Sequence, residues 1–353
     1  MNGSAHKKME DYVKQLGFMS VLLLTLAQPL LVEAAEDPTA TLVERAKKEG
    51  KLLVYTSMNA RDATVLLQEF KKRYPFIDTN LYRANSLKLL PRIELEARTK
   101  KHQADVFTAS FPIWPELIRQ KLVAPYVSPE SQRYPKELKD PNGYWTILYL
   151  QVMGIAYNTK LVPSGSAPKR YEDLLNPRWK KQEIAMDYRD STWFAVMMEI
   201  MGENEGLNFM KRLAAKDLYM RENKSLLTQL LAAGEFSILA NTYVDTAVEY
   251  IRSGAPIEWL PGRDPVPAST HLLGIYAYAQ NPNAAKLFVD FLLSKEGQKA
   301  MSGGTVLKFP ANPDVESDLK SKVKGHKLHP IDPTMAAKFD RVAKNYEEIF
   351  WKK

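Results

Sequence analysis

A polar stretch between a predicted strand and a predicted helix carries the clearest chemistry in this sequence, and it reads YRDSTWF. Arg189 can pair with a carboxylate or a phosphate. The backbone amides of Ser191, Thr192 and Trp193 can hold an anion at the start of a helix. The alternative is that Asp190 caps the helix while Arg189 stays solvated. The residues leave both open, although Asp190 argues mildly against an anion because like charges would meet.

Other polar residues fall where predicted strands end, which is where ligands sit in open α/β sheets. Tyr243 follows an apolar run in the stretch ILANTYVDT, and Gln151 lies in a long extended run. The predicted ligand-binding residues outside YRDSTWF are Asn59, Arg61, Ser86, Ser110, Gln151 and Tyr243. Each of them alone is more often a loop or cap residue than a ligand contact.

Aromatic side chains and one histidine accompany these positions. Trp193, Trp114 and Tyr188 can form an aromatic wall around a ligand or can belong to the core. For His271, a buried and hydrogen-bonded structural role is the more common outcome.

The first part of the chain alternates strands and helices. Apolar residues such as Val65, Leu66 and Phe70 recur at helical spacing, and Pro75 stops that helix. The resulting β-α-β-α-β-α order predicts a parallel sheet with crossover helices. Strands are predicted at 52–57, 77–84 and 104–110, and helices at 37–51, 61–75, 86–101 and 111–123, the third of them disturbed at Pro91.

The later part contains two longer extended segments. Residues 144–162 exceed one ordinary strand and suit a strand that crosses between two lobes, and 267–280 are the predicted return crossing. The remaining predictions include strands at 183–188 and 236–243, a helix and a turn at 171–182, and a pair of helices at 190–216 that is broken near Gly202–Gly206. Further helices are predicted at 223–235, 244–255, 281–302 and near 334–351.

Composition excludes several classes of protein. The chain has 353 residues, which suits about two domains. Its net charge is +8, but the basic residues are interleaved with 41 acidic ones, so a solvated basic surface is expected and no nucleic-acid partner. There is no cysteine, which removes disulfides, thiolate nucleophiles and cysteine metal sites.

The first 35 residues have the layout of a secretory signal peptide. A basic start precedes the apolar segment LGFMSVLLLTLAQPLLV, and Val32 and Ala34 suit positions −3 and −1 of a cleavage site. Gln28 and Pro29 interrupt the apolar segment, which is shorter than the roughly 20 residues of a spanning helix. We therefore predict a signal peptide at 1–35 and a periplasmic protein.

Motifs for catalysis are missing from the sequence. We find no nucleophile elbow, phosphate-binding loop, His-Glu metal helix or paired carboxylates in a motif context, so no enzyme and no cofactor are predicted. His326 and His329 are three residues apart, but a solvated stretch is the more common meaning of such a pair without nearby carboxylates.

Four segments occur in a familiar order: KEGKLLVYTSMN, ADVFTAS, GIAYNTKLVP and NAAKLFVDFLLSKEGQKAM. Together they resemble the extracellular solute-binding proteins of ABC importers, in the branch that includes periplasmic ferric-iron-binding proteins. The resemblance runs from about Leu42 to Asn312.

The resemblance implies an α/β fold of the type II periplasmic-binding-protein kind, with two lobes joined by crossing strands and a ligand in the cleft between them. Lobe 1 is predicted at 36–150 plus 272–312 and lobe 2 at 151–271. A C-terminal helical segment, 313–353, is left without a lobe. The implied partners are a small-molecule ligand and an ABC permease in the inner membrane, with the protein itself a monomer.

Iron carriers of this branch bind Fe³⁺ through a histidine, a glutamate and two adjacent tyrosines. The corresponding positions here are Asn59, Ser110, Thr242 and Tyr243. Only Tyr243 matches, so most of the anionic charge is absent and no metal site is predicted. The expected ligand is a small polar or anionic solute. A first alternative is that the protein carries ferric iron or an iron chelate, with Tyr243 as an iron ligand. A second alternative is that the protein presents its ligand to a receptor.

Overall fold

The structure is a computed structural model that describes residues 38–332 and 336–351, so the predicted signal peptide lies outside the described residues. None of the helices described is long and apolar enough to cross a membrane. The α-helices are α2 (Pro38–Glu49), α3 (Ala60–Arg73), α4 (Ser86–Thr99), α5 (Trp114–Arg119), α6 (Ser191–Met201), α7 (Glu203–Ala214), α8 (Lys224–Ala233), α9 (Val244–Arg252), α10 (Pro282–Leu293), α11 (Lys295–Ser302), α12 (Asp318–Lys322) and α13 (Ala336–Phe350).

The sheet runs in the order β2-β1-β3-β10-β5-β8-β6-β7, with four short strands attached at its sides. Short 3₁₀ helices are η1 (Phe111–Ile113), η2 (Pro129–Arg133), η3 (Lys136–Leu138), η4 (Ser164–Ser166) and η5 (Tyr171–Leu175). The strands are β1 (Lys51–Thr56), β2 (Asp78–Arg83), β3 (Val106–Ser110), β4 (Val123–Ala124), β5 (Thr146–Asn158), β6 (Ile184–Asp187), β7 (Tyr219–Arg221), β8 (Ile238–Tyr243), β9 (Ile257–Leu260), β10 (Val266–Tyr276), β11 (Phe309–Pro310) and β12 (Leu328–Pro330).

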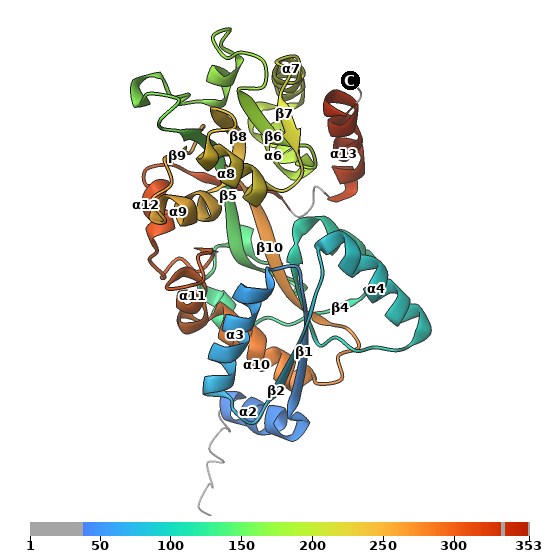
Figure 1. Ribbon diagram of the computed structural model, residues 1–353. Helices are drawn as coiled ribbons and strands as arrows, with labels where there is room; N and C mark the ends of the chain where they lie inside the picture. The colour runs from blue at the N-terminus through green and yellow to red at the C-terminus, as the bar shows by residue number, and fades with distance from the viewer. Residues whose placement is uncertain (1–37, 333–335, 352–353) are drawn as a thin grey trace, which may run out of the picture. The chain divides into compact units, whose positions relative to one another are not determined.

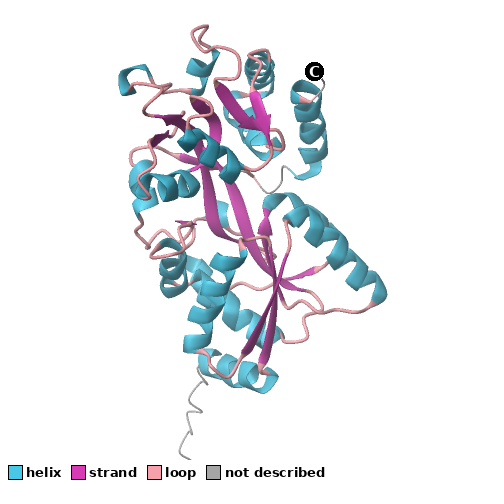
Figure 2. Cartoon of the chain, viewed as in Figure 1, coloured by secondary structure: helices cyan, strands magenta, loops and turns pink. Residues whose placement is uncertain are grey.

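Two groups of parallel strands occupy the two ends of this sheet. We call β2-β1-β3 the first half and β8-β6-β7 the second half. Within each half the paired strands are parallel. Helices join consecutive strands of the first half, as the alternation of apolar runs and amphipathic segments predicts. Figure 2 shows helices on the sides of both groups of strands.

Two long antiparallel strands, β5 and β10, connect the halves and run side by side through the middle of Figure 1. β10 pairs with β3 of the first half, and β5 pairs with β8 of the second half. Every residue of β10 is buried, and Gln151 is the only residue of β5 that is not. Both strands are therefore covered on both faces, although the middle of β10 keeps the buried polar residues Ser269, Thr270 and His271.

The register of these pairings makes the carboxyl ends of the two halves face each other. At the end of β3, Ser110 pairs with His271, which pairs with Tyr149 of β5. At the end of β8, Tyr243 pairs with Met153 of β5. The two ends therefore register at positions of β5 that are four residue steps apart, which is about 13 Å at about 3.3 Å per residue. We call this space the cleft and residues 149–153 of β5 its floor.

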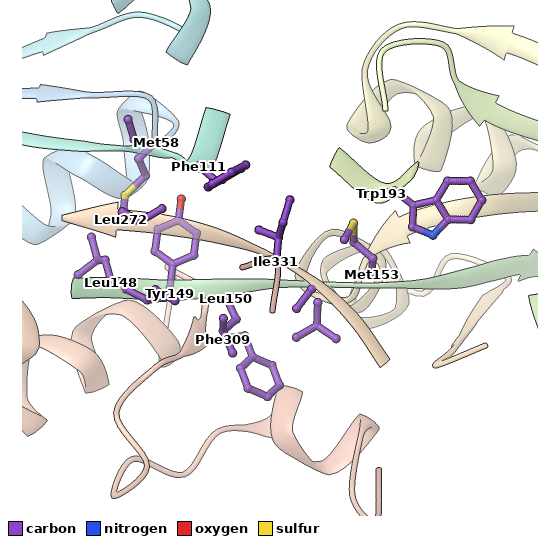
Figure 3. Packing of buried hydrophobic residues seen from close by; sticks show 14 of the residues in the cluster. Met58, Phe111, Leu148, Tyr149, Leu150, Met153, Trp193, Leu272, Phe309 and Ile331 are labelled. Atoms are coloured by element: carbon purple, nitrogen blue, oxygen red, sulfur yellow. The ribbon is translucent and has the colours of Figure 1, made fainter. Parts of the chain in front are cut away.

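Large apolar side chains pack around the crossing strands. Figure 3 shows Tyr149, Leu150 and Met153 of β5 among buried residues that come from distant parts of the chain, including Phe111 and Ile331. Burial of each such side chain contributes roughly 1.5–3 kcal/mol, so this cluster is a main source of stability for the centre of the sheet.

Several elements differ from the sequence-based prediction. The predicted helix 281–302 is two helices, because Ser294 has extended backbone and its Oγ accepts a hydrogen bond from the amide of Gly297, which starts α11. Pro91 lies inside α4 without ending it. The short strands β7, β9 and β12 have no counterpart in the prediction, because three or four residues are too few to show a periodic pattern.

The C-terminal helix α13 contacts elements on both sides of the cleft. It packs on α6 and α7, which belong with the second half, and it also contacts α5, which follows β3. Phe339 of α13 packs edge-on against Phe111 at the end of β3, with ring centroids 5.7 Å apart.

Candidate functional site

The floor of the cleft carries a polar group of side chains. Tyr149 and Gln151 alternate along β5 on one face, and His271 and Ser269 are their partners on β10. The rings of Tyr149 and His271 are stacked, with centroids 4.5 Å apart and planes 12° from parallel. Gln151 is the one partly exposed residue of β5, and it lines neither of the two cavities described below.

His271 is buried, and neither ring nitrogen has a hydrogen-bond partner among the described residues. Burial, reinforced by the positive charge of Lys308, lowers the pKa of His271 to about 3. The imidazole is therefore neutral at physiological pH, which differs from the hydrogen-bonded histidine that the sequence suggested.

The contacts of Asp190 at the start of α6 show which role its carboxylate has. Its carboxylate accepts a hydrogen bond from the amide of Trp193 at 3.3 Å, which makes it the N-cap of α6. The same carboxylate lies 2.7 Å from the ammonium of Lys224 and also accepts a hydrogen bond from Asn241. Asp190 therefore has the capping role that the sequence left open. The backbone amides of Ser191 and Thr192, in the first turn, have no hydrogen-bond acceptor inside the helix.

A cavity of about 560 Å³ lies at the carboxyl ends of β3 and β6. It is bounded by α4, η1 and α5 on one side, by the start of α6 on the other, and by α13. We call it the α13 cavity. Its lining residues are Leu90, Pro112, Ile113, Pro115, Glu116, Arg189, Ser191, Phe339, Ala343, Tyr346, Glu347 and Trp351.

Arg189 is the only cation among the described residues that line the α13 cavity. Its guanidinium lies 3.0 Å from the carboxylate of Glu222, and the side chains of both are about half exposed. It also lies over the ring of Tyr188 at 5.5 Å. Exposed ion pairs of this kind are weak, so the guanidinium can exchange Glu222 for an incoming carboxylate or phosphate.

A second cavity, of about 410 Å³, lies between the starts of α3 and α9. Asn59 lines it and caps α3, accepting a hydrogen bond from the amide of Asp62 at 2.8 Å. Arg61 lines it as well and donates a hydrogen bond to the carbonyl of Thr305 at 2.7 Å. We call it the Lys308 cavity.

Lys308 connects the two halves at this cavity. Its ammonium lies 3.2 Å from the carboxylate of Asp62 in α3 and 3.0 Å from that of Asp245 in α9. All three side chains are largely buried, and the two carboxylates raise the pKa of Lys308 against the lowering effect of burial. The charges of this cavity are therefore already compensated within the protein.

The remaining predicted residues lie elsewhere around the cleft. Ser86 begins α4 after β2, and Ser110 is the last residue of β3. Tyr243 ends β8, with the Lys224 ammonium 4.9 Å from its ring centroid. Trp193 is fully buried with its ring against Tyr171, so it lines neither cavity.

Two further aromatic predictions are also located. Trp114 is buried, and its indole donates a hydrogen bond to the carbonyl of Ala109, so it belongs to the core. Tyr188 donates a hydrogen bond to Glu222 and lies beside Arg189. Of the ten predicted ligand residues, Arg189 and Ser191 line the α13 cavity, while Asn59 and Arg61 line the Lys308 cavity.

The positions that hold iron in the resembled carriers have other contacts here. Thr242 is fully buried and hydrogen-bonded to Thr228 at 2.9 Å. Burial raises the pKa of Tyr243 to about 12, which keeps its phenol protonated. Within residues 38–332 and 336–351 there is no group of three or more His, Cys, Asp or Glu placed to hold a metal ion. His329 lies 2.9 Å from Glu199, whereas His326 is exposed.

Sequence reasoning missed Lys224, Lys308 and the residues of α13 as parts of this region. Lys224 follows β7, and the three residues of that strand are too few for recognition from sequence. Lys308 has no motif around it, and only its contacts with α3 and α9 reveal its position.

Comparisons with known proteins are consistent across sequence and structure. The family described as bacterial extracellular solute-binding protein matches residues 102–333. An uncharacterized protein from Haemophilus influenzae is 29% identical over 287 residues, covering 77% of this chain and 81% of that protein. A putative 2-aminoethylphosphonate-binding periplasmic protein from Salmonella typhimurium is 24% identical over 57% of this chain, which spans 60% of that protein's length.

Solved structures of periplasmic binding proteins share the fold. AfuA from Actinobacillus pleuropneumoniae, with fructose-6-phosphate bound, superimposes with a TM-score of 0.71 at 23% identity, covering 86% of this chain and 99% of that chain. Iron-bound HitA from Pseudomonas aeruginosa gives 0.73 at 18% identity, covering 85% and 99%. The predicted two-lobe periplasmic-binding-protein fold is thereby confirmed, and this chain belongs to the bacterial extracellular solute-binding proteins.

Proposed function

We propose that this protein binds a small organic solute with one acidic group in the α13 cavity and delivers it, in the periplasm, to the permease of an ABC importer. The observation that carries the proposal is the position of Arg189 at the edge of a largely apolar cavity at the carboxyl ends of β3 and β6. Ligand sites of small molecules are mostly apolar with a few convergent polar groups, and the volume of about 560 Å³ is in their usual range.

The choice between the two cavities follows from their charges. In the Lys308 cavity, three basic residues (Arg61, Arg252, Lys308) face three acidic ones (Asp62, Asp245, Glu249), several of them already paired. A solute there would have to replace buried ion pairs, which is costly. In the α13 cavity Arg189 has only the exposed carboxylate of Glu222 as an ionic partner in the described chain.

Delivery to a permease is supported by membership in the solute-binding family and by the division of the sheet into two halves with a cleft between them. A solute that contacts both sides of a cleft favours the closed conformation, in which the two sides are close together. A permease can recognise that closed conformation. We propose that the protein acts as a monomer, does no catalysis and has no nucleic-acid partner, so that binding is saturable without turnover of the solute.

The test is a thermal-shift and calorimetric screen of the mature protein with carboxylates, phosphorylated compounds, sugars, amines and Fe³⁺. A ligand at 100 times its Kd adds about 2.7 kcal/mol to the free energy of unfolding. Arg189→Gln should weaken binding of the acidic solute by roughly 1.5–3 kcal/mol, because a charge-assisted contact is lost. Arg212→Gln, an exposed arginine of α7 outside the cavity, is the control.

The alternatives give different results in the same screen. Saturable binding of Fe³⁺ that disappears in Tyr243→Phe would support an iron carrier. Binding of an acidic solute that is unchanged in Arg189→Gln would place the site elsewhere in the cleft. Presentation to a receptor gives the same binding as import, and reconstituted transport with the permease separates the two.

A further inference from the structure

The C-terminal helix α13 is held in place by contacts with the second half of the sheet. The hydroxyl of Tyr346 donates a hydrogen bond to the carbonyl of Asp187 at the end of β6. The indole of Trp351 donates one to the carbonyl of Tyr188. The ring of Phe194 in α6 packs edge-on against Tyr346, with centroids 5.6 Å apart. α13 is thus anchored beside Arg189.

The opposite edge of α13 reaches the first half. Phe339 packs against Phe111 at the end of β3, so the helix lies along the α13 cavity from one side of the cleft to the other. Five of the twelve lining residues come from this part of the chain: Phe339, Ala343, Tyr346, Glu347 and Trp351. The match to the solute-binding family ends at residue 333, before α13 begins at Ala336.

The walls of the cavity are apolar and partly aromatic. Leu90, Pro112 and Ile113 line it from the first half, while Phe339 and Tyr346 of α13 line it together with Trp351, which directly follows that helix. Trp351 is 45% exposed, which leaves much of its ring open to a ligand. Aromatic rings gain offset or edge-on contacts with one another beyond the burial of their area. Such walls favour a solute with an aromatic ring over an aliphatic or sugar-like one.

The charges around the cavity limit the number of acidic groups. Glu116 lines the same cavity, and hydrogen bonds from Arg119 and Gln120 lower its pKa, so it is ionised. Its carboxylate is already paired with the guanidinium of Arg119. Glu347 of α13 is exposed and also lines the cavity. Arg189 is therefore the only cation among the described lining residues, which also include two carboxylates. Because Glu116 is already paired with Arg119, a second acidic group on the solute would mainly meet the like charge of Glu347.

From these observations we infer that α13 is the specificity element of the site and that the solute is an aromatic monoanion. Its acidic group lies at Arg189, and its ring lies against Phe339 and Trp351. The inference rests on the proposed function, since it concerns the same cavity, but it names a class of solute and a recognising helix that the binding role alone does not require.

The test is calorimetric titration of the mature full-length protein and its variants with four probes. Phenylacetate is the aromatic monoanion, hexanoate the aliphatic monoanion, phthalate the aromatic dianion and fructose 6-phosphate the sugar phosphate. We expect phenylacetate to bind at least tenfold more tightly than the other three. Phe339→Ala and Trp351→Ala should each weaken phenylacetate at least fivefold, and Trp351→Phe, which keeps a ring, should weaken it less.

The charge component has its own matched pair of variants. Glu347→Gln should raise the affinity for phthalate several-fold, whereas Glu348→Gln makes the same change one residue away, outside the cavity lining. Equal responses of the two variants would mean that general surface charge, and not Glu347, acts on the dianion, which would contradict the inference. Far-ultraviolet circular dichroism of each variant checks that the fold is kept.

Failure of the inference differs from failure of the proposed function. Tight binding of hexanoate or fructose 6-phosphate that Arg189→Gln weakens, but that Phe339→Ala and Trp351→Ala leave unchanged, overturns the role of α13 and keeps an acidic solute at Arg189. If neither these probes nor the broader screen of acidic compounds gives saturable binding to the wild-type protein, both proposals fail.

Discussion

The ammonium of Lys224 lies 2.7 Å from the carboxylate of Asp190, and this buried ion pair joins the start of α8 to the start of α6. The side chains are 9% and 3% exposed, so water solvates neither charge well. The pair fixes the carboxylate that caps α6, next to the arginine on which the proposed function depends. It is therefore a structural support of the candidate site.

Loss of Lys224 should destabilise the protein strongly. Lys224→Met leaves the charge of Asp190 buried without its partner, and we expect a loss of about 3–5 kcal/mol in the free energy of unfolding, measured by urea denaturation at pH 7.5. Lys181→Met removes an ion pair with Asp217 in which both side chains are well exposed, and should cost less than about 1 kcal/mol. Similar losses in the two variants would show that the buried pair is not special.

Loss of Lys308 should weaken the connection between α3 and α9. Lys308→Met leaves the buried carboxylates of Asp62 and Asp245 without their shared cation, so we expect a loss of about 3 kcal/mol or more on urea denaturation. Lys322→Met, which breaks a more exposed pair with Glu258, is the matched control. If Asp245→Asn in the Lys308→Met background restores no stability, uncompensated charge is not the cause.

His271 should make stability depend on pH below neutrality. In the unfolded chain it takes up a proton near its ordinary pKa of about 6.5, whereas in the folded protein its pKa is about 3. Between these values the unfolded state binds more protons, so stability should fall as the pH drops, by up to about 1.4 kcal/mol per pH unit.

The measurement compares wild type with His271→Phe, which keeps a ring to stack on Tyr149. Urea denaturation at pH 7.5, 6 and 4.5 should show a shallower loss of stability in the variant than in the wild type. His102→Phe is the control, at a histidine that hydrogen-bonds Tyr276. Its free energy of unfolding should differ between pH 6 and pH 4.5 by as much as that of the wild type. An unchanged slope in His271→Phe would mean that other groups cause the pH dependence.

Gly154 should tolerate no side chain. A Cβ atom there would lie 2.3 Å from the carbonyl oxygen of Leu260 and 2.4 Å from the ring of Trp259, so β9 would have to move away from β5. We expect Gly154→Ala to cost about 1–3 kcal/mol in urea denaturation. Gly165→Ala, where a Cβ would meet nothing within 4 Å, should be nearly neutral, and an equal loss there would refute the steric explanation.

Much of the fold was accessible from sequence because its signals are local. Apolar runs such as LLVYTS and amphipathic helices such as α3 are visible in consecutive residues, and the order of β and α elements implies parallel pairing. The division of the predicted helix 281–302 was missed because its cause is the single extended residue Ser294, in a sequence whose apolar spacing continues on both sides.

The candidate site was only partly accessible. The stretch YRDSTWF indicated Arg189 as a candidate ligand residue, and it indicated either an anion site or a cap at the start of α6. The structure shows Asp190 in the capping role. Whether the ten predicted residues contact a ligand remains a prediction. The sequence could not separate Trp193, which is buried in the core, from Arg189 at the cavity, since both lie in the same short stretch.

The sequence by itself determined the alternation of strands and helices, the lack of cysteine chemistry and the resemblance to solute-binding proteins, because these depend on residue types and short-range order. Tertiary structure alone decided the register of β5 on β10 and β8, which sets the cleft, and the ion pairs of Lys224 and Lys308. It also decided that α13 lies beside Arg189. These features join residues far apart in the chain, and no local pattern specifies such contacts.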